Sequence, residues 1–434
     1  RRFDKMRSLS TQGTAPIQTA AEELAGFHLP EGFKMELVAS EPTMNKVVDL
    51  AFDDAGKMWA ITAVEYPIDG NESSEAAELY ARGGRDKVLV FDESWKPGPH
   101  TPRVFADGLV IPMAILPRVG TEGDSVLIGQ GPDILRLEDQ DGDGRADESE
   151  VVLTGFGIQD SHLLPHRFVR APGGWVYVAQ GAFNSSQVQT TQGDVVAFNK
   201  CKVARFQSDG SQFEVVGTGL NNIWGFVLDR LGDKWIQEAN DLGYPLVPFE
   251  HGASYPGIGS HRARPHSPWR PALAKFRMGG TGLSGLALSE HRSGYPAPWD
   301  EAFFLANPIL SCIQTIRAER SEDQPSVVAL TRTADIVISE DKNFRPIAIH
   351  FGPDGCLYVV DWYNPIISHN EVPRNHPDRD KTHSRIWRIR HTSQEYSAPR
   401  DVTAVADADL PALLDAPSTW ESRAAWHQIA DRQA

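Results

Sequence analysis

An acidic stretch of twelve residues, DQDGDGRADESE at 139–150, carries side chains that could bind a cation. Counted from the first residue, carboxylates stand at loop positions 1, 3, 5, 9 and 12. Gly144 stands at position 6, where a calcium loop turns sharply and favours glycine, and position 7 supplies a backbone carbonyl. The spacing therefore predicts a calcium site with these ligands: Asp139, Asp141, Asp143, the carbonyl of Arg145, Asp147 and Glu150.

The flanks of this stretch, PDILRLE before it and VVLTGFG after it, are apolar and β-branched and show no helical pattern. They predict a turn between two strands rather than the helix–loop–helix that usually carries such a loop. We expect the ion to relieve repulsion among the carboxylates and to brace a corner of a sheet, with catalysis elsewhere. An acidic turn without an ion is the alternative.

The stretch QDSHLLPHRF at 159–168 offers candidate catalytic residues in His162, His166 and Arg167. A neutral imidazole can accept the proton of a substrate hydroxyl near pH 7. The alternative for each histidine is a structural role within the core.

Two further stretches combine polar and aromatic residues. GLNNIWGF contains Asn221, Asn222 and Trp224, which suit a planar or sugar ligand and suit a tight turn almost as well. The long stretch from 361 to 388, DWYNPIISHNEVPRNHPDRDKTHSRIWR, joins two apparent strands. Connections of that length are usually functional or disordered, and the polar content favours function. Its candidate ligand-binding residues are Asp361, Asn364, His369 and Arg385.

The elements that must position these residues repeat along the chain. An apolar strand, a turn with Asp or Gly and an aromatic-rich strand recur at intervals of 48 to 69 residues. The recurring strands centre on Trp59, Leu127, Trp175, Trp235, Phe304 and Tyr358. Six such units predict an all-β fold, a six-bladed β-propeller, with one or two β-sandwiches as the alternative. Because closure removes exposed sheet edges, we expect both ends of the propeller to meet in one blade.

In a closed ring, loops far apart in sequence converge over the central channel. We therefore expect His162 or His166, Asn222, Asp361 and His369 to line one pocket at one mouth of the channel, with Arg167 close by. Outside the propeller, at 28–395, we expect an N-terminal arm at 1–27 with a short helix and a helical tail at 396–434. The tail is either a closing appendage or the start of a helical repeat domain.

Composition excludes several classes of function. The 434 residues have a formal net charge of −16, which argues against broad binding to nucleic acid or anionic membranes. No apolar run is long enough to span a membrane, and no signal peptide is visible in this sequence. The three cysteines form no CxxC pair, and no GxSxG, HExxH, Rossmann or P-loop motif is present.

Several motifs in fixed order carry a family resemblance: VEYP, FADGLVIPMAILP, GWVYVAQG, NNIWGF, IQEANDLGYP and FGPDGCLYVVDWYNPIISHNEVPRNHPDRDKTHSRIWRI. They resemble the membrane-bound dehydrogenase domain of Planctomycetes and Verrucomicrobia, which is similar to the soluble quinoprotein glucose and sorbosone dehydrogenases. The resemblance covers about residues 26 to 392. It implies a six-bladed propeller, a periplasmic or extracellular location, and pyrroloquinoline quinone (PQQ) with calcium as cofactors.

The resemblance also implies roles for particular residues. In the quinoprotein dehydrogenases a histidine followed by an arginine takes the sugar hydroxyl proton, which points here to His162 or His166 with Arg167. Their arginine–asparagine pair at the quinone falls on Asn221 and Asn222, so that arginine is absent here. Relatives often carry a haem-binding CxxCH domain as electron acceptor. This sequence has none, which implies a separate acceptor.

Two functions follow from the sequence. The leading one is a secreted quinoprotein-like dehydrogenase that oxidises a carbohydrate or another small alcohol. The alternative is a calcium-braced propeller that binds or cleaves glycans without a redox cofactor. Dye reduction after addition of PQQ and calcium separates the two.

Overall fold

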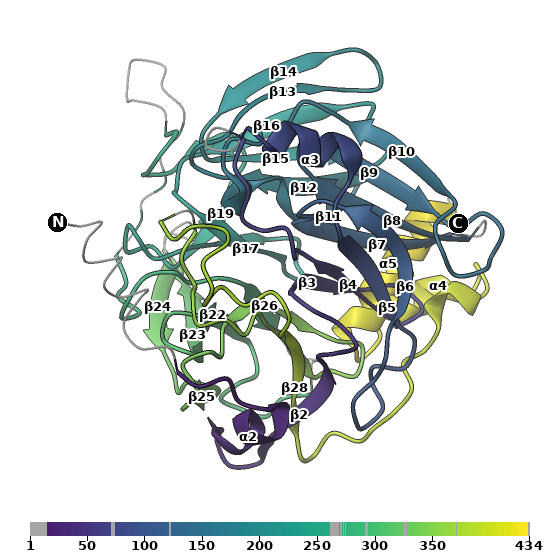
Figure 1. The fold of residues 1–434 in the computed structure, drawn as a ribbon. Helices are drawn as coiled ribbons and strands as arrows, with labels where there is room; N and C mark the ends of the chain where they lie inside the picture. Colours follow the sequence, from purple (N-terminus) through teal and green to yellow (C-terminus); the bar gives the residue numbers. More distant parts are fainter. Residues whose placement is uncertain are drawn as a thin grey trace.

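The protein forms a ring of β-sheets around a central axis (Figure 1). The computed structural model describes residues 15–70, 74–120, 123–260, 269, 271, 273, 275–290, 294–323, 328–369 and 371–432. Within these residues the sheets make six blades, so the predicted six-bladed β-propeller is confirmed. No helix in the described parts of the chain is both long enough and apolar enough to cross a membrane.

The first three blades follow one another along the chain. Blade 1 contains β3 (Val47–Phe52), β4 (Met58–Thr62), β5 (Asp86–Phe91) and β6 (Arg103–Leu109). Blade 2 contains β7 (Ala114–Gly120), β8 (Gly123–Gln130), β9 (Asp133–Glu138) and β10 (Glu148–Leu153). Blade 3 contains β11 (His166–Ala171), β12 (Trp175–Gln180), β15 (Lys202–Gln207), β16 (Phe213–Thr218) and β20 (Ala253–Ser254), and carries the hairpin β13 (Ser185–Gln189) and β14 (Val195–Asn199).

The last three blades complete the ring. Blade 4 contains β17 (Ile223–Leu228), β18 (Lys234–Glu238) and β19 (Leu246–Phe249). Blade 5 contains β21 (Leu286–Ser289), β22 (Ala302–Asn307), β23 (Cys312–Arg320), β24 (Val328–Arg332), β25 (Val337–Ser339) and the short strand β1 (Phe27–His28). Blade 6 contains β26 (Pro346–Phe351), β27 (Leu357–Asp361), β28 (Arg385–His391) and β2 (Phe33–Ser40).

Short helices lie outside the blades. They are α2 (Ala20–Ala25), α3 (Ala76–Arg82), α4 (Leu410–Leu413) and α5 (Thr419–Arg432), with 3-10 turns η1 (Ser161–Leu163) and η2 (Val402–Ala404).

The ring closes in blade 6. The early strand β2 pairs antiparallel with β28, from Phe33 opposite His391 to Ser40 opposite Arg385. The two ends of the propeller therefore meet in one blade, as predicted. Arg388 is buried at this seam, and its guanidinium donates to the Glu36 carboxylate at 2.7 Å.

A side-chain interaction explains why the turn motif recurs with an aromatic residue. In blade 1 the Asp53 carboxylate accepts hydrogen bonds from the backbone N–H of Lys57 and from Nε1 of Trp59. In blade 4 Asp229 binds Trp235 in the same way, at 3.1 Å. Gly56 takes a φ of 87° between the two strands, a conformation that favours glycine. The aspartate thus fixes both the turn and the ring of the following strand.

The apolar core is divided among the seams between blades. The seam between blades 1 and 2, for example, buries Trp59, Phe105 and Ile128. The innermost strands β3, β7, β11, β17, β21 and β26 contact one another in sequence around the axis.

The C-terminal helices lie on one end of the ring. His427 and Gln428 of α5 bind the Asp54 carboxylate, in the first turn of blade 1, at 2.9 and 2.7 Å. Arg423 binds Glu290, just after β21, at 2.8 Å. Both contacts lie where the inner strands end, so α5 covers this end of the propeller. The opposite end, where the inner strands begin, faces the viewer in Figure 1 and carries α3.

Candidate functional site

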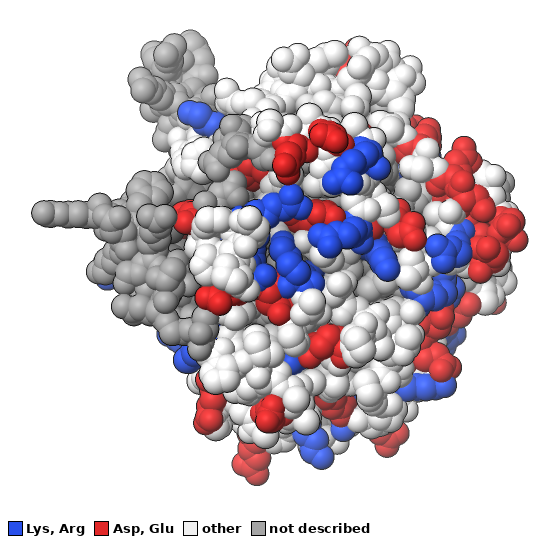
Figure 2. Space-filling model, in the orientation of Figure 1, with Lys and Arg blue, Asp and Glu red and all other residues white. Residues whose placement is uncertain are grey.

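Three connections meet at the end of the propeller opposite α5. They join β4 to β5, β10 to β11 and β27 to β28, and they come from three different blades. A cleft of about 780 Å³ opens there. Figure 2 shows Lys and Arg side chains gathered in the middle of this face. The cleft is lined by Val64, Pro67, Ile68, Asp69, Ser74, Glu75, Arg85, Pro373, Arg374, Asn375, His376, Arg379 and Lys381.

His162 lies among aromatic rings beside this cleft. The Tyr66 hydroxyl and His162 Nδ1 are 3.1 Å apart. The His162 ring lies 4.9 Å from the Trp224 ring and 5.2 Å from the His369 ring, between centroids. Burial, followed by the charge of His369, lowers the pKa of His162 to about 3. The imidazole is therefore neutral at pH 7, and a bound anion would raise its pKa toward the range of an effective base.

His369 joins the same cluster through two carboxylates. Its Nε2 lies 3.1 Å from Asp69 Oδ1 and 3.5 Å from Asp160 Oδ1. Burial alone would lower the pKa of His369, but the hydrogen bond to Asp69 and the charge of Asp160 raise it overall. Burial raises the pKa of Asp160 to about 6. The expected convergence of His162 and His369 from different blades is thus present in the structure.

The cationic residues of the cleft differ in burial and in the partners that their N–H donors already have. Arg85 and Arg374 share the Glu65 carboxylate, at 2.7 and 2.6 Å. Arg379 is buried and donates to backbone carbonyls of its own loop, so its role is to hold that loop in shape. Lys381 Nζ donates to the backbone carbonyls of Val64, at 2.9 Å, and Tyr66. Burial, followed by the charge of Arg379, lowers the pKa of Lys381 to about 7.

Arg167 lies deeper, among the inner strands that surround the axis. Its guanidinium binds the Asp49 carboxylate of β3 at 3.0 Å, and His350 Nε2 of β26 lies 2.7 Å from the same carboxylate. The three residues come from blades 3, 1 and 6 and tie these inner strands together. Arg167 takes a φ of 58°, which is uncommon for a residue with a side chain.

His166 is buried with both ring nitrogens against backbone carbonyls. Nδ1 lies 2.6 Å from the Leu164 oxygen, and Nε2 lies 2.5 Å from the Ile223 oxygen. No ring nitrogen is left for a substrate proton. Between the two candidate histidines, the geometry favours His162 as a base.

The asparagine pair lies in the connection before β17. The Asn221 side chain accepts a hydrogen bond from the Ile258 N–H at 3.0 Å, so it holds a turn. The Asn222 carbonyl accepts from the Ala239 N–H at 3.0 Å. Trp224 packs against both His162 and His166 and is the member of this stretch that reaches the cluster.

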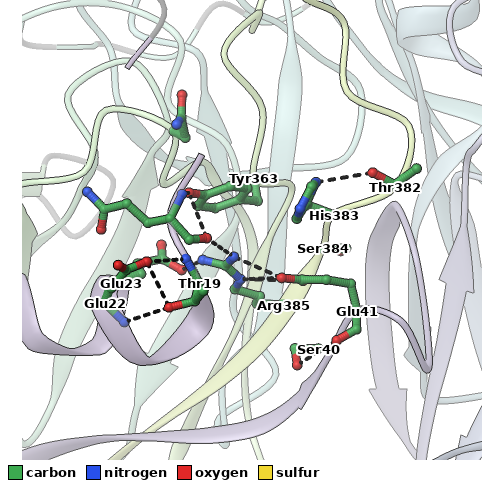
Figure 3. Close-up of polar contacts among 12 residues, drawn as sticks. Thr19, Glu22, Glu23, Ser40, Glu41, Tyr363, Thr382, His383, Ser384 and Arg385 are labelled. Atoms are coloured by element: carbon green, nitrogen blue, oxygen red, sulfur yellow. Dashed lines mark hydrogen bonds and ion pairs between the residues drawn. The ribbon is translucent and has the colours of Figure 1, made fainter. Parts of the chain in front are cut away.

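Asp361 and Arg385 do not join the histidine cluster. Asp361 is fully buried, and its Oδ1 accepts hydrogen bonds from the backbone N–H groups of Arg345 and Tyr363 at 2.8 Å. Arg385 binds Glu23 of α2 and Glu41, and it stacks 3.9 Å above the Tyr363 ring (Figure 3). These residues dock the N-terminal helix on blade 6, which places them away from the expected pocket.

Asn364 has a structural position in the long connection of blade 6. Its Nδ2 donates to the Asp380 carbonyl at 2.9 Å, and its Oδ1 accepts from the Ile366 N–H at 3.0 Å. The side chain thus fixes the loop that presents His369.

The acidic loop joins β9 to β10, as its flanks predict. Carboxylate oxygens of Asp139, Asp141 and Asp147 lie within 4.8 Å of one another. Asp139 also accepts the N–H groups of Gly142 and Gly144, which folds the loop around it. Hard oxygen donors at this spacing fit calcium.

Two of the predicted calcium ligands, Asp143 and Glu150, are not part of this group of three carboxylates. Glu150 lies within β10 and binds Arg136 of β9 at 2.7 Å. The Asp143 carboxylate accepts the N–H of Arg145 at 2.8 Å. The loop also packs against the outer strand of blade 1, where the Ala146 N–H donates to the Phe105 carbonyl at 2.8 Å. This contact places the loop at a seam between blades.

Sequence reasoning missed several residues of the site, chiefly Tyr66, Asp69, Asp160, Arg374 and Lys381. The connection between β4 and β5 spans more than twenty residues, and such length was a usable signal. Nothing in the sequence indicates that Asp69, Asp160 and His369 meet, because they belong to three blades.

Comparison with known proteins places this architecture in a family. No curated protein matches the sequence. A family model described as a domain of unknown function, DUF7133, matches residues 19–393. The chain belongs to the DUF7133 family. The matched region of this DUF7133 protein runs from α2 to the end of blade 6 and leaves the C-terminal helices outside.

Several solved structures are similar to this chain at low sequence identity. An oxidoreductase described as a glucose dehydrogenase from Thermus thermophilus matches with a TM-score of 0.52 and 16% identity, over 83% of this chain and 100% of its own. The PQQ-bound aldose sugar dehydrogenase of Streptomyces coelicolor has a TM-score of 0.47 and 13% identity, over 83% and 99%. The apo-form of the soluble Escherichia coli enzyme has 0.45 and 14%, over 83% and 99%. At 16% identity the likeness to the Thermus thermophilus protein concerns the fold alone.

Proposed function

We propose that this DUF7133 protein is a secreted quinoprotein-like dehydrogenase that oxidises a sugar or another small alcohol. One observation supports the proposal above all. On one face of the propeller, the His162 imidazole and its Tyr66 partner adjoin a cleft lined by cationic side chains. The imidazole suits removal of a hydroxyl proton, and the cations suit an anionic cofactor.

The side chains of the cleft fit PQQ, which is a tricarboxylate quinone. Arg85, Arg374 and Lys381 would hold its carboxylates. A guanidinium carries five N–H donors, so contacts with Glu65 leave donors for a ligand. When bound, the quinone supplies an acceptor for the hydride of the alcohol. Asn222, in the connection before β17, and Trp224, at the start of β17, are candidates for contacts with the ligand.

The chain's own residues would bind the alcohol and move its proton. In the tautomer that carries the proton on Nδ1, His162 donates to the Tyr66 oxygen and keeps a lone pair on Nε2. That lone pair would accept the hydroxyl proton of the substrate. Arg167 lies too deep among the inner strands to share this step, and we assign it to holding the strands in place.

The remaining parts of the proposal follow the family resemblance. We assign calcium to the acidic loop at 139–150, as a brace between blades, and a separate protein as electron acceptor. We also propose a periplasmic or extracellular location, as for the membrane-bound dehydrogenase domain of Planctomycetes and Verrucomicrobia.

Reconstitution tests the proposal. Purified protein is incubated with PQQ and calcium, and reduction of a redox dye is followed with a panel of aldoses, other sugars and simple alcohols. We expect dye reduction that requires both PQQ and a substrate, and tighter PQQ binding than in Arg374→Ala or Lys381→Met. Absence of PQQ binding by the folded wild-type protein would contradict the assignment.

A further inference from the structure

A second group of ligand-type side chains lies beside the proposed base. Asp69, Asp160 and His369 come from the connections of blade 1, of blades 2 to 3 and of blade 6. One ligand atom from each lies within 4.8 Å of the others. Both aspartates are buried and His369 is half-buried. Three loops thus place a nitrogen and two carboxylates around one point.

The carboxylates are oriented by their surroundings. Asp69 Oδ1 accepts hydrogen bonds from the Ser161 N–H at 2.7 Å and the Ser161 hydroxyl at 2.6 Å. Asp160 Oδ1 accepts the His162 N–H at 3.0 Å. Metal ligands are commonly held in this way by outer hydrogen bonds.

An independent observation comes from Tyr80 of α3. Its hydroxyl is buried and has no hydrogen-bond partner among the described residues. Burial, followed by the charge of the Asp69 carboxylate, raises the pKa of the Tyr80 hydroxyl. A buried hydroxyl without a partner is costly, so a water held near the Asp69 carboxylate would stabilise it.

We propose that Asp69, Asp160 and His369 Nε2 bind one divalent transition-metal ion at the edge of the cleft. Two carboxylates side by side in a buried site repel each other, and a divalent cation offsets that repulsion. An imidazole ligand favours manganese, iron, cobalt or zinc over calcium, which distinguishes this site from the acidic loop. Asp69 lines the cleft, so a substrate oxygen or water can reach the remaining coordination positions.

The metal would add a function to the face that carries His162. The His369 ring lies 5.2 Å from the His162 ring and stacks 5.8 Å from Tyr66. A cation here can polarise a hydroxyl or carbonyl oxygen next to the proposed base. Metal binding at this site does not require the quinone. The test below therefore uses the metal alone as the probe.

The test is calorimetric titration of metal-stripped protein with Mn²⁺ and with Co²⁺, in excess calcium to saturate the acidic loop. We expect one equivalent of metal to bind, with weakening of at least about tenfold in His369→Gln and in Asp160→Asn. Asp160→Asn is nearly isosteric and keeps an oxygen for the His162 N–H, so it guards against loss of folding. Circular dichroism checks that both variants fold.

His376→Gln is the matched control, because His376 lies on the same loop and lines the same cleft but is outside the cluster. Its metal affinity should equal that of the wild type. Co²⁺ bound through His369 should also give a visible absorption band that is absent from His369→Gln. Failure of the folded wild-type protein to bind either metal, or binding by both variants as tight as in wild type, would overturn the proposal. These outcomes leave the quinone proposal untouched, since that proposal is tested by PQQ binding.

Discussion

Glu23 and Asp361 show how a buried pair of carboxyl groups is tolerated at the scale of single residues. Burial, followed by the charge of Asp361, raises the pKa of Glu23 to about 10, while Arg385 acts in the opposite direction. Burial likewise raises the pKa of Asp361 to about 6. At pH 7 the pair therefore holds a proton, and Arg385 compensates the remaining charge.

This pair predicts a specific dependence of stability on pH. Between about pH 4.5, the ordinary pKa of a glutamate, and about pH 10, folded Glu23 keeps a proton that the unfolded chain loses. The free energy of unfolding should thus fall as pH rises through this window, by up to about 1.4 kcal/mol per pH unit for one proton. Glu23→Gln cannot titrate, so it should gain stability relative to wild type between pH 5 and pH 9. Urea denaturation at several pH values measures the free energy of unfolding of both proteins. The same dependence of this free energy on pH in the wild type and in Glu23→Gln would refute the assignment.

The chemical types of the candidate side chains could be identified from the sequence. The residues that surround each of them in the fold could not. Asp361 and Arg385 have the residue types of a binding site, but the N-terminal helix covers them and uses them for docking. His162 and His166 lie four residues apart and look equivalent in the sequence. In the structure, only His166 has both ring nitrogens against backbone carbonyls. Such differences depend on which distant backbone lies against each ring.

At the scale of elements, the acidic loop links two blades. Its Gly144 carbonyl accepts a hydrogen bond from Arg103, and Arg103 also binds Asp124 at 3.1 Å, so the loop, β6 and β8 share one network. We expect calcium to stabilise this seam because the ion binds only the folded loop.

Thermal unfolding with and without calcium tests the loop. Chelation should lower the melting temperature of the wild-type protein, by an amount that grows with the calcium concentration of the untreated sample. Asp141→Asn removes one exposed carboxylate and should reduce that response without disturbing Asp139, which folds the turn. Equal calcium responses in the wild type and the variant would show that the loop is not the site. His369→Gln is the control for the second proposed metal site and should keep the calcium response.

Local elements were the most predictable feature of this chain. In blades 1 and 4 the recurring strand follows a turn whose aspartate acts within a few residues, as Asp53 and Asp229 do with their tryptophans. Calcium ligation was less predictable, because Glu150 belongs to a strand and its register places it opposite Arg136. A loop motif specifies spacing along the chain and leaves strand register open.

For the whole molecule, we propose that the propeller is a folding unit apart from the helical tail that follows residue 395. The apolar cluster of the tail is made of tail residues, including Val402, Leu410 and Ala424. Its hydrogen bonds to the propeller come mostly from polar side chains such as Arg423 and His427, with one from the Val402 N–H to the Asp54 carbonyl. Blade 6 closes without the tail, through β2 and β28.

Removal of residues 396–434 tests this division. The shortened chain should fold, with a loss of about 2–4 kcal/mol in the free energy of unfolding, because several polar contacts of the tail are lost and each contributes up to about 1 kcal/mol. It should also keep the cleft and its PQQ affinity, since the tail covers the opposite end of the ring. Guanidinium denaturation measures the first quantity. A shortened chain that does not fold would show that the tail is part of the propeller's core.

Contacts between residues of different blades were the feature of the molecule that was hardest to predict from the sequence. The propeller and its closure could be predicted, and closure brought His162 and His369 together although about 200 residues separate them. The sequence could not show that Asp49, Arg167 and His350 meet beneath that face. Their contacts require the side chains of three inner strands, from different blades, to point toward one another.

The central claim is that His162 removes a proton from the substrate at the cleft. Turnover of PQQ-reconstituted wild type and His162→Ala, with the best substrate from the panel, tests it most directly. Loss of a general base should lower kcat by roughly 10²–10⁴ while PQQ affinity and unfolding free energy stay near wild type. His28→Ala, at an exposed position on the edge of blade 5, is the control and should keep full activity. Wild-type kcat in a folded, PQQ-loaded His162→Ala protein would contradict the claim.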